Sequence, residues 1–138
     1  EAHYLRSLVE EQREALSRDD YLGFYAADDM LHAVMFRIAG YPNARRLIET
    51  AKFEVDRTRS LKKRYRLRPV AEVQVEHAEI VNAIADGDAE TAGRRMAQHL
   101  ARVNDSLVEL VQAEKLGYLF QSLNNNGHAR RRTRKARG

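Results

Sequence analysis

Apolar residues recur every three or four positions along most of the chain, and this spacing predicts a protein built from helices. Gly40, Pro69 and the turn ADGD interrupt the pattern, while Asp19 or Asp20 and then Asp88 stand where helix caps are expected. The segments so defined cover about residues 2–17, 20–39, 42–68, 70–86 and 89–117. Short connections between long helices predict an all-α fold, an antiparallel helical bundle of five to six helices.

The charges divide the chain unevenly. The last eleven residues, HARRRTRKARG, hold six of the 24 Lys and Arg residues and no acid, whereas residues 1–127 hold 18 bases and 20 acids. We therefore predict one helical domain over residues 1–117 and a short extension with a disordered basic tail over residues 118–138. Contact of this tail with phosphates is the alternative, but the net charge alone does not indicate a nucleic-acid-binding domain.

The composition also indicates the cellular compartment of the protein. Cysteine is absent, so neither disulfides nor thiolate metal ligands are available. No apolar run approaches the length of a membrane span, and the first residues are charged. These features predict a soluble cytoplasmic protein without membrane contact.

Four polar residues interrupt the apolar stripes of three predicted helices. Asp28 and His32 lie four residues apart in DDMLH and so share one helix face, while His77 and His99 lie on the inward faces of two later segments. Imidazoles with one carboxylate suit a divalent metal: zinc first, with nickel, manganese, iron or cobalt as alternatives. Core histidines with an Asp28–His32 ion pair would give the same pattern, and periodicity does not decide between the two interpretations.

The same residues resemble a known family. The D-x3-H pair in FYAADDMLHAVMFRIAGYPNARRLIE, the histidine in EHAEIVNAIADGD and the histidine in MAQHL are similar to the FCD domain, the effector-binding domain of GntR-type bacterial transcription regulators of the FadR branch. The resemblance covers roughly residues 5–112, although Leu31 and Tyr41 replace the more usual residues. It implies that Asp28, His32, His77 and His99 bind one metal ion and that a small organic acid completes its coordination.

The resemblance also implies what the chain lacks. Nothing in the sequence matches the winged helix-turn-helix domain of these regulators, so we expect DNA binding only in a longer protein that carries one. The first helix of the family's domain also has no counterpart, and the apolar surface that it would cover favours a homodimer.

The chain offers several arginines that could bind the carboxylate of an organic acid. Arg57, Arg59 and Arg66 lie in the third predicted helix, and Arg59, one turn after Val55, is the ligand-binding candidate we choose. The function predicted is thus a ligand-sensing domain and not an enzyme. The alternatives are a metal-dependent enzyme and a structural dimerisation bundle without metal.

Overall fold

The protein is described by a computed structural model that covers the backbone of residues 1–43, 46, 50, 52–65, 67 and 69–135. Side chains are described for residues 1–43, 46, 50, 56–62, 64, 67, 69–115, 117 and 118. All regular elements in these parts are helices: α1 (Ala2–Ser17), α2 (Tyr21–Ile38), α4 (Lys52–Tyr65), α5 (Val70–Ala85) and α6 (Ala89–Lys135). The predicted all-α class is confirmed.

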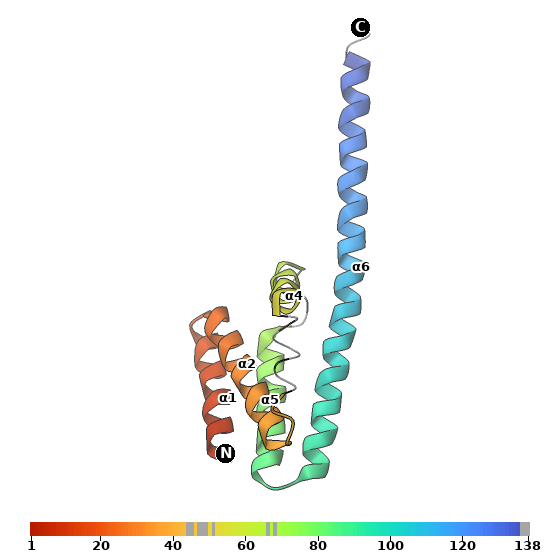
Figure 1. Ribbon diagram of the computed structural model, residues 1–138. Coiled ribbons are helices and arrows are strands. Elements are labelled where there is room, and N and C mark those ends of the chain that lie inside the picture. Colours follow the sequence, from red (N-terminus) through yellow and green to blue (C-terminus); the bar gives the residue numbers. More distant parts are fainter. Residues whose placement is uncertain (44–45, 47–49, 51, 66, 68, 136–138) are drawn as a thin grey trace.

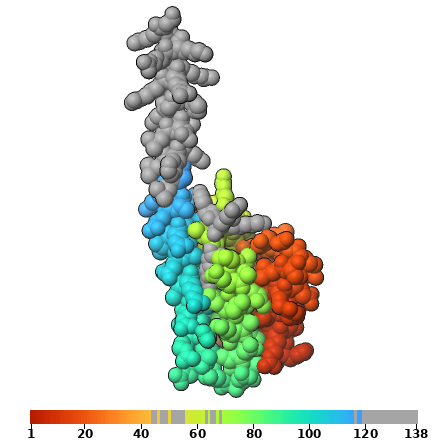
Figure 2. Space-filling model, turned by 180° about the vertical axis from the view of Figure 1, so that it is seen from behind, coloured from red at the N-terminus to blue at the C-terminus, as the bar shows by residue number. Residues whose placement is uncertain are grey.

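The helices form an antiparallel bundle. α1 packs against both α2 and α5, and α5 packs against α6 on its other side. Successive neighbours run in opposite directions, with α1 and α6 ascending and α2 and α5 descending in Figure 1. Figure 2 shows the same order from behind, with α5 between α1 and α6. α4 contacts α6 at the upper end of this group.

Aspartate side chains cap the N-termini of α2 and α6, two helices that contribute to the candidate site. The Asp20 carboxylate accepts a hydrogen bond from the backbone N–H of Gly23 at 2.9 Å, and Asp88 accepts one from Thr91 N–H at 2.9 Å. A Cβ at Gly23 would lie 2.3 Å from Asp20 Oδ2, so any other residue at this position would displace the capping carboxylate. Gly40 follows α2 with a φ of +83°, as the sequence predicts for a helix end.

The hydrophobic core lies between α1, α2 and α5. Its buried cluster consists of Leu5, Leu8, Leu31, Val34 and Val81. Burying a side chain of this size stabilises the fold by about 1.5–3 kcal/mol relative to leaving it in water. Two polar side chains, Gln12 and His77, are as fully buried as these residues, each at 0% exposure. Polar groups at such positions need internal partners, and those partners define the candidate site.

One predicted boundary differs from the structure. α6 continues through Gly117 to Lys135, where the sequence predicts an end near residue 117. A single glycine lowers helix stability by about 1 kcal/mol and does not by itself end a helix, and no proline follows Pro69. The division of the chain into a domain and a tail at residue 117 stays a prediction.

The third predicted helix corresponds in its second half to α4, which begins at Lys52. The predicted apolar positions Leu47, Ile48 and Ala51 lie outside the described residues. None of the described helices combines the length and the hydrophobicity that crossing a membrane requires.

Candidate metal centre

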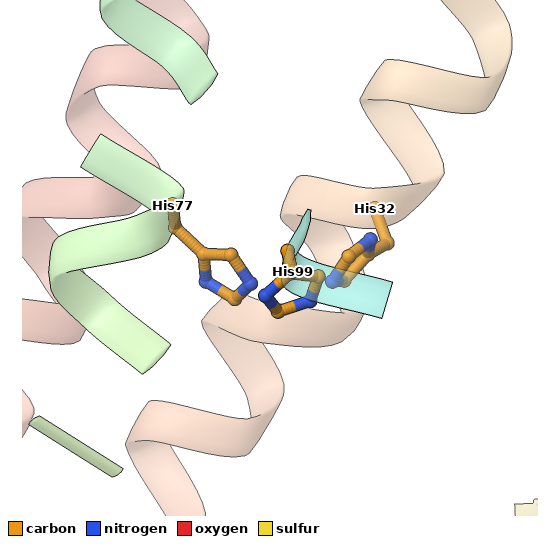
Figure 3. Close-up of side chains that lie close together, drawn as sticks. All are labelled: His32, His77 and His99. Atoms are coloured by element: carbon orange, nitrogen blue, oxygen red, sulfur yellow. The ribbon is translucent and has the colours of Figure 1, made fainter. Parts of the chain in front are cut away.

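Three histidines from three helices meet at one point of the bundle. His32 comes from α2, His77 from α5 and His99 from α6, and one ring nitrogen of each lies within 4.8 Å of the others. The ring centroids are 5.1 Å apart for His32 and His77, and 4.8 Å apart for His77 and His99. Figure 3 shows the three imidazoles facing one another. The structure thus brings together three of the four predicted ligands.

The outer ring nitrogens of two of these histidines are held by buried polar side chains. Nδ1 of His77 lies 3.1 Å from Oε1 of Gln12, and Nδ1 of His99 lies 2.8 Å from Oε2 of Glu76. A carboxylate only accepts hydrogen bonds, so Nδ1 of His99 donates its proton to Glu76, which leaves Nε2 as the nitrogen that can bind a metal. A hydrogen bond at one ring nitrogen is how proteins orient a metal-binding imidazole and fix its tautomer.

His32 is the most accessible of the three, with 27% of its side chain exposed. Burial lowers the pKa of His32 below its ordinary value of 6.5; the Asp28 carboxylate opposes this effect, and His99 adds to it. The neutral imidazole is the form that binds a metal, because the ring nitrogen must offer a lone pair. The electrostatic environment of His32 therefore favours the ligating state near neutral pH.

Asp28 lies beside the three histidines, and its two oxygens have different neighbours. Oδ1 is 3.6 Å from Nδ1 of His77 and 3.7 Å from Nε2 of His32, and Gln12 donates a long hydrogen bond to it at 3.4 Å. Oδ2 accepts a hydrogen bond from Arg59 Nη2 at 2.7 Å. The carboxylate is therefore adjacent to the imidazoles but also engaged by α4, and its role as the fourth ligand stays a prediction.

Arg59, the predicted carboxylate-binding residue, lies at the edge of this cluster. Its side chain is 16% exposed and also pairs with Asp29 Oδ1 at 2.8 Å and with Asp56 Oδ1 at 3.3 Å. Its guanidinium lies 4.6 Å from the centre of the Tyr25 ring, a cation–π arrangement. Burial alone would lower the pKa of Arg59, but the adjacent aspartates raise it, so the side chain stays charged.

The other two arginine candidates are not assigned to the cluster, since Arg57 is exposed on α4 and Arg66 lies outside the described residues.

The sequence prediction missed Gln12 and Glu76, although a signal was present for both. Gln12 follows Leu8 by one turn and precedes Ala15, on the buried face of α1. Glu76 precedes Ile80 by one turn on the buried face of α5 and is 7% exposed. Its second oxygen accepts a hydrogen bond from Arg102 Nη1, which neutralises the buried charge. Gln12 and Glu76, which contact the rings of His77 and His99, form the supporting shell of the site.

The side chains fit a divalent metal in type, tautomer and approximate spacing. Zinc–imidazole bonds of about 2.0–2.1 Å place tetrahedral ligand nitrogens about 3.4 Å apart. The observed limit of 4.8 Å is wider than this, so metal binding would require small side-chain rotations that bring the rings closer together. Three neutral imidazoles with an adjacent carboxylate would leave coordination positions for water or an exchangeable ligand.

Comparison with known proteins identifies the family. The FCD domain profile matches residues 1–102. The chain is 30% identical over 101 residues to an uncharacterized HTH-type transcriptional regulator in an unstable DNA locus of Streptomyces ambofaciens, covering 73% of this chain and 41% of the relative. It is 28% identical over 112 residues to the HTH-type transcriptional repressor RspR of Escherichia coli, covering 81% of this chain and 49% of the relative.

The chain thus spans about half the length of these curated relatives or less. No solved structure matches it significantly.

Proposed function

This chain belongs to the FCD domain family, and we propose that it senses a small organic acid at a divalent metal ion on behalf of an HTH-type transcriptional regulator. The observation that carries the proposal is the convergence of His32, His77 and His99 from three helices, with two of the rings oriented from behind by Gln12 and Glu76. A core histidine needs one hydrogen-bond partner, whereas this arrangement directs three imidazoles at one another.

The metal set that we propose is His32, His77, His99 and Asp28. Zinc is the first candidate because it accepts imidazole nitrogen and carboxylate oxygen, while nickel, manganese, iron and cobalt accept the same ligands. Asp28 would add negative charge beside three neutral rings and so offset part of the charge of the ion. Its Oδ1 lies 3.7 Å from His32 Nε2, close enough to join the set after a small rotation.

The proposed effector is a carboxylate. A bound divalent ion would supply a Lewis-acidic anchor for a carboxylate oxygen at a coordination position that the protein leaves open. Arg59 is the residue that we propose for a second contact with the acid, since its guanidinium is the charged donor that borders Asp28. Effector binding would influence a DNA-binding region only if two conformations of the regulator bind the acid with different affinity.

A homodimer is part of the proposal. Leu100, Leu107, Val111 and Tyr118 share one face of α6 and are 38–74% exposed. Apolar residues repeated on one helix face suit contact with a second protein surface. Light scattering coupled to size exclusion measures the mass, and a purely monomeric chain at micromolar concentration would contradict this part.

Two rival functions rest on the same residues. A metal-dependent enzyme would need a general base directed at the metal-bound ligand, and the buried acid nearest to the histidines, Glu76, lies behind His99 at Nδ1 instead. Turnover of an ester, phosphoester or hydroperoxide by metal-loaded protein would favour this rival. A dimerisation bundle without metal would show the same melting temperature before and after chelation.

The sensing function is tested by calorimetric titration of succinate into zinc-loaded and chelator-treated protein. We expect saturable binding to the zinc-loaded form and none to the metal-free form, since the anchor for the acid would be missing. His77→Ala is the matched control, because it should lose the response although zinc is supplied. Equal heats for all three samples would contradict metal-anchored sensing.

A further inference from the structure

Arg59 links α4 to the aspartate that borders the histidines. Its Nη2 lies 2.7 Å from Oδ2 of Asp28 and 2.8 Å from Oδ1 of Asp29, and both acids belong to α2. Stacking on Tyr25, also of α2, adds a third contact between the two helices. The pair with Asp28 is largely shielded from solvent, with 16% of the Arg59 and 14% of the Asp28 side chain exposed, and shielded ion pairs are stronger than those at the surface.

The Asp28 carboxylate joins two environments. Oδ1 faces His32 and His77 at 3.7 and 3.6 Å, while Oδ2 faces the guanidinium on the other side. A divalent cation among the imidazoles and the Arg59 guanidinium would therefore be attracted to the same negative charge. The two cations would also repel each other across one carboxylate, and the low exposure of the site limits the screening of this repulsion.

Arg59 also orients Asp28, which by itself would favour metal binding. This contribution is the smaller one, since Asp28 lies inside the helix α2, where the backbone limits its side chain to few rotamers. Loss of Arg59 would thus remove a full positive charge while leaving part of the orientation in place. The balance of the two effects favours tighter metal binding without the guanidinium.

We propose that Arg59 sets the metal affinity of the centre by competing with the ion for Asp28, and that metal occupancy thereby loosens the attachment of α4 to α2. This inference rests on the proposed metal site. Coupling between two equilibria is reciprocal: if the Arg59–Asp28 pair weakens metal binding by some factor, bound metal weakens that pair by the same factor. α4 would then be the element that responds to occupancy of the centre.

The test compares the wild-type chain with Arg59→Gln, Arg59→Lys and the control Arg57→Gln, which removes the same charge from an exposed position of the same helix. Zinc affinity is measured by competition with a chelator, and hydrogen exchange of the α4 backbone is measured with and without zinc. Arg59→Gln should bind zinc about tenfold more tightly, whereas Arg59→Lys and Arg57→Gln should stay within about twofold of the wild type.

In the wild type, zinc should accelerate amide exchange in α4. In Arg59→Gln, exchange should be fast already and insensitive to zinc. Unchanged or weaker zinc binding by Arg59→Gln, or exchange in wild-type α4 that zinc does not alter, would overturn the inference and leave the metal site intact. Failure of the wild-type chain to bind zinc would instead overturn the metal site, and the inference with it.

Discussion

Replacing Gln12 by leucine tests whether the supporting shell of the histidine cluster holds the fold together. Gln12 is 0% exposed and lies 3.1 Å from Nδ1 of His77, which is itself fully buried. Its contact with Asp28 at 3.4 Å exceeds the usual range of an N–H···O hydrogen bond, so it contributes little. Leucine has a similar volume, so the substitution leaves no large cavity and the loss is mainly that of one buried hydrogen bond.

Leaving a buried polar group without its acceptor costs about 1–3 kcal/mol, so the free energy of unfolding of Gln12→Leu should fall by about 2 kcal/mol. For a chain of 138 residues this corresponds to a decrease of about 6 °C in Tm. The assay is urea unfolding followed by circular dichroism in the presence of a chelator, because bound metal would stabilise the folded state by mass action.

The matched control for this prediction is Gln112→Leu, at an exposed position of α6 remote from the histidines. Its free energy of unfolding should lie within about 0.5 kcal/mol of the wild type. If Gln12→Leu also changed stability by less than this amount, the hydrogen bond between Gln12 and His77 would not support the buried imidazole, and the argument from the supporting shell would be wrong.

Four further predictions concern the metal ion and the histidines that would bind it. Glu76→Gln should weaken zinc binding about tenfold to a hundredfold, since a neutral amide holds the His99 ring less firmly than a carboxylate; unaltered affinity in a chelator competition would contradict this. Asp28→Ala should lower metal occupancy less than loss of a histidine, and elemental analysis showing an equal or greater loss would refute it. Lowering the pH to about 5 should release metal, because protons compete for imidazoles with an unperturbed pKa of about 6.5, and complete retention after dialysis at that pH would be the contrary result. In the metal-free chain, burial lowers the pKa of His32 in the folded state, so on acidification the unfolded state takes up this proton at a higher pH than the folded state. The free energy of unfolding should therefore keep its full value above about pH 6.5 and decrease below it.

Much of the fold could be predicted because helix faces and helix ends are local properties of the chain. The spacing of apolar residues predicts α1, α2 and α5 almost to the residue. The cap at Asp88 is as predicted, and of the two candidates Asp19 and Asp20 the structure selects Asp20. The end of α6 could not be predicted in the same way. Gly117 is compatible both with a helix end and with a helix interior, and no local feature decides between them.

The histidines could be assigned to inward faces, but their meeting point could not be derived from periodicity. Spacing fixes which face of a helix a residue occupies, whereas convergence also depends on the rotation of three helices relative to one another. Only the family resemblance supplied that relation before the structure was considered. The pairing of Arg59 with Asp28 depends in addition on how α4 crosses α2, across 31 positions of sequence, and no local pattern encodes it.

Gln12 and Glu76, in contrast, could have been predicted from the sequence. Both lie on apolar stripes that the sequence analysis had already identified, and both are polar residues that a buried face accepts only with partners. Their position on the buried faces of α1 and α5 therefore predicts polar partners inside the bundle, where the histidines lie.

The central claim is that His32, His77 and His99 bind one metal ion, and elemental analysis of the purified chain and its histidine variants tests it most directly. We expect close to one divalent ion per chain in the wild type and a large loss of metal in His77→Ala and in His99→Ala, with circular dichroism verifying that each variant is folded. Equal metal content in the wild type and in both folded variants, or no bound metal in the wild type, would contradict it.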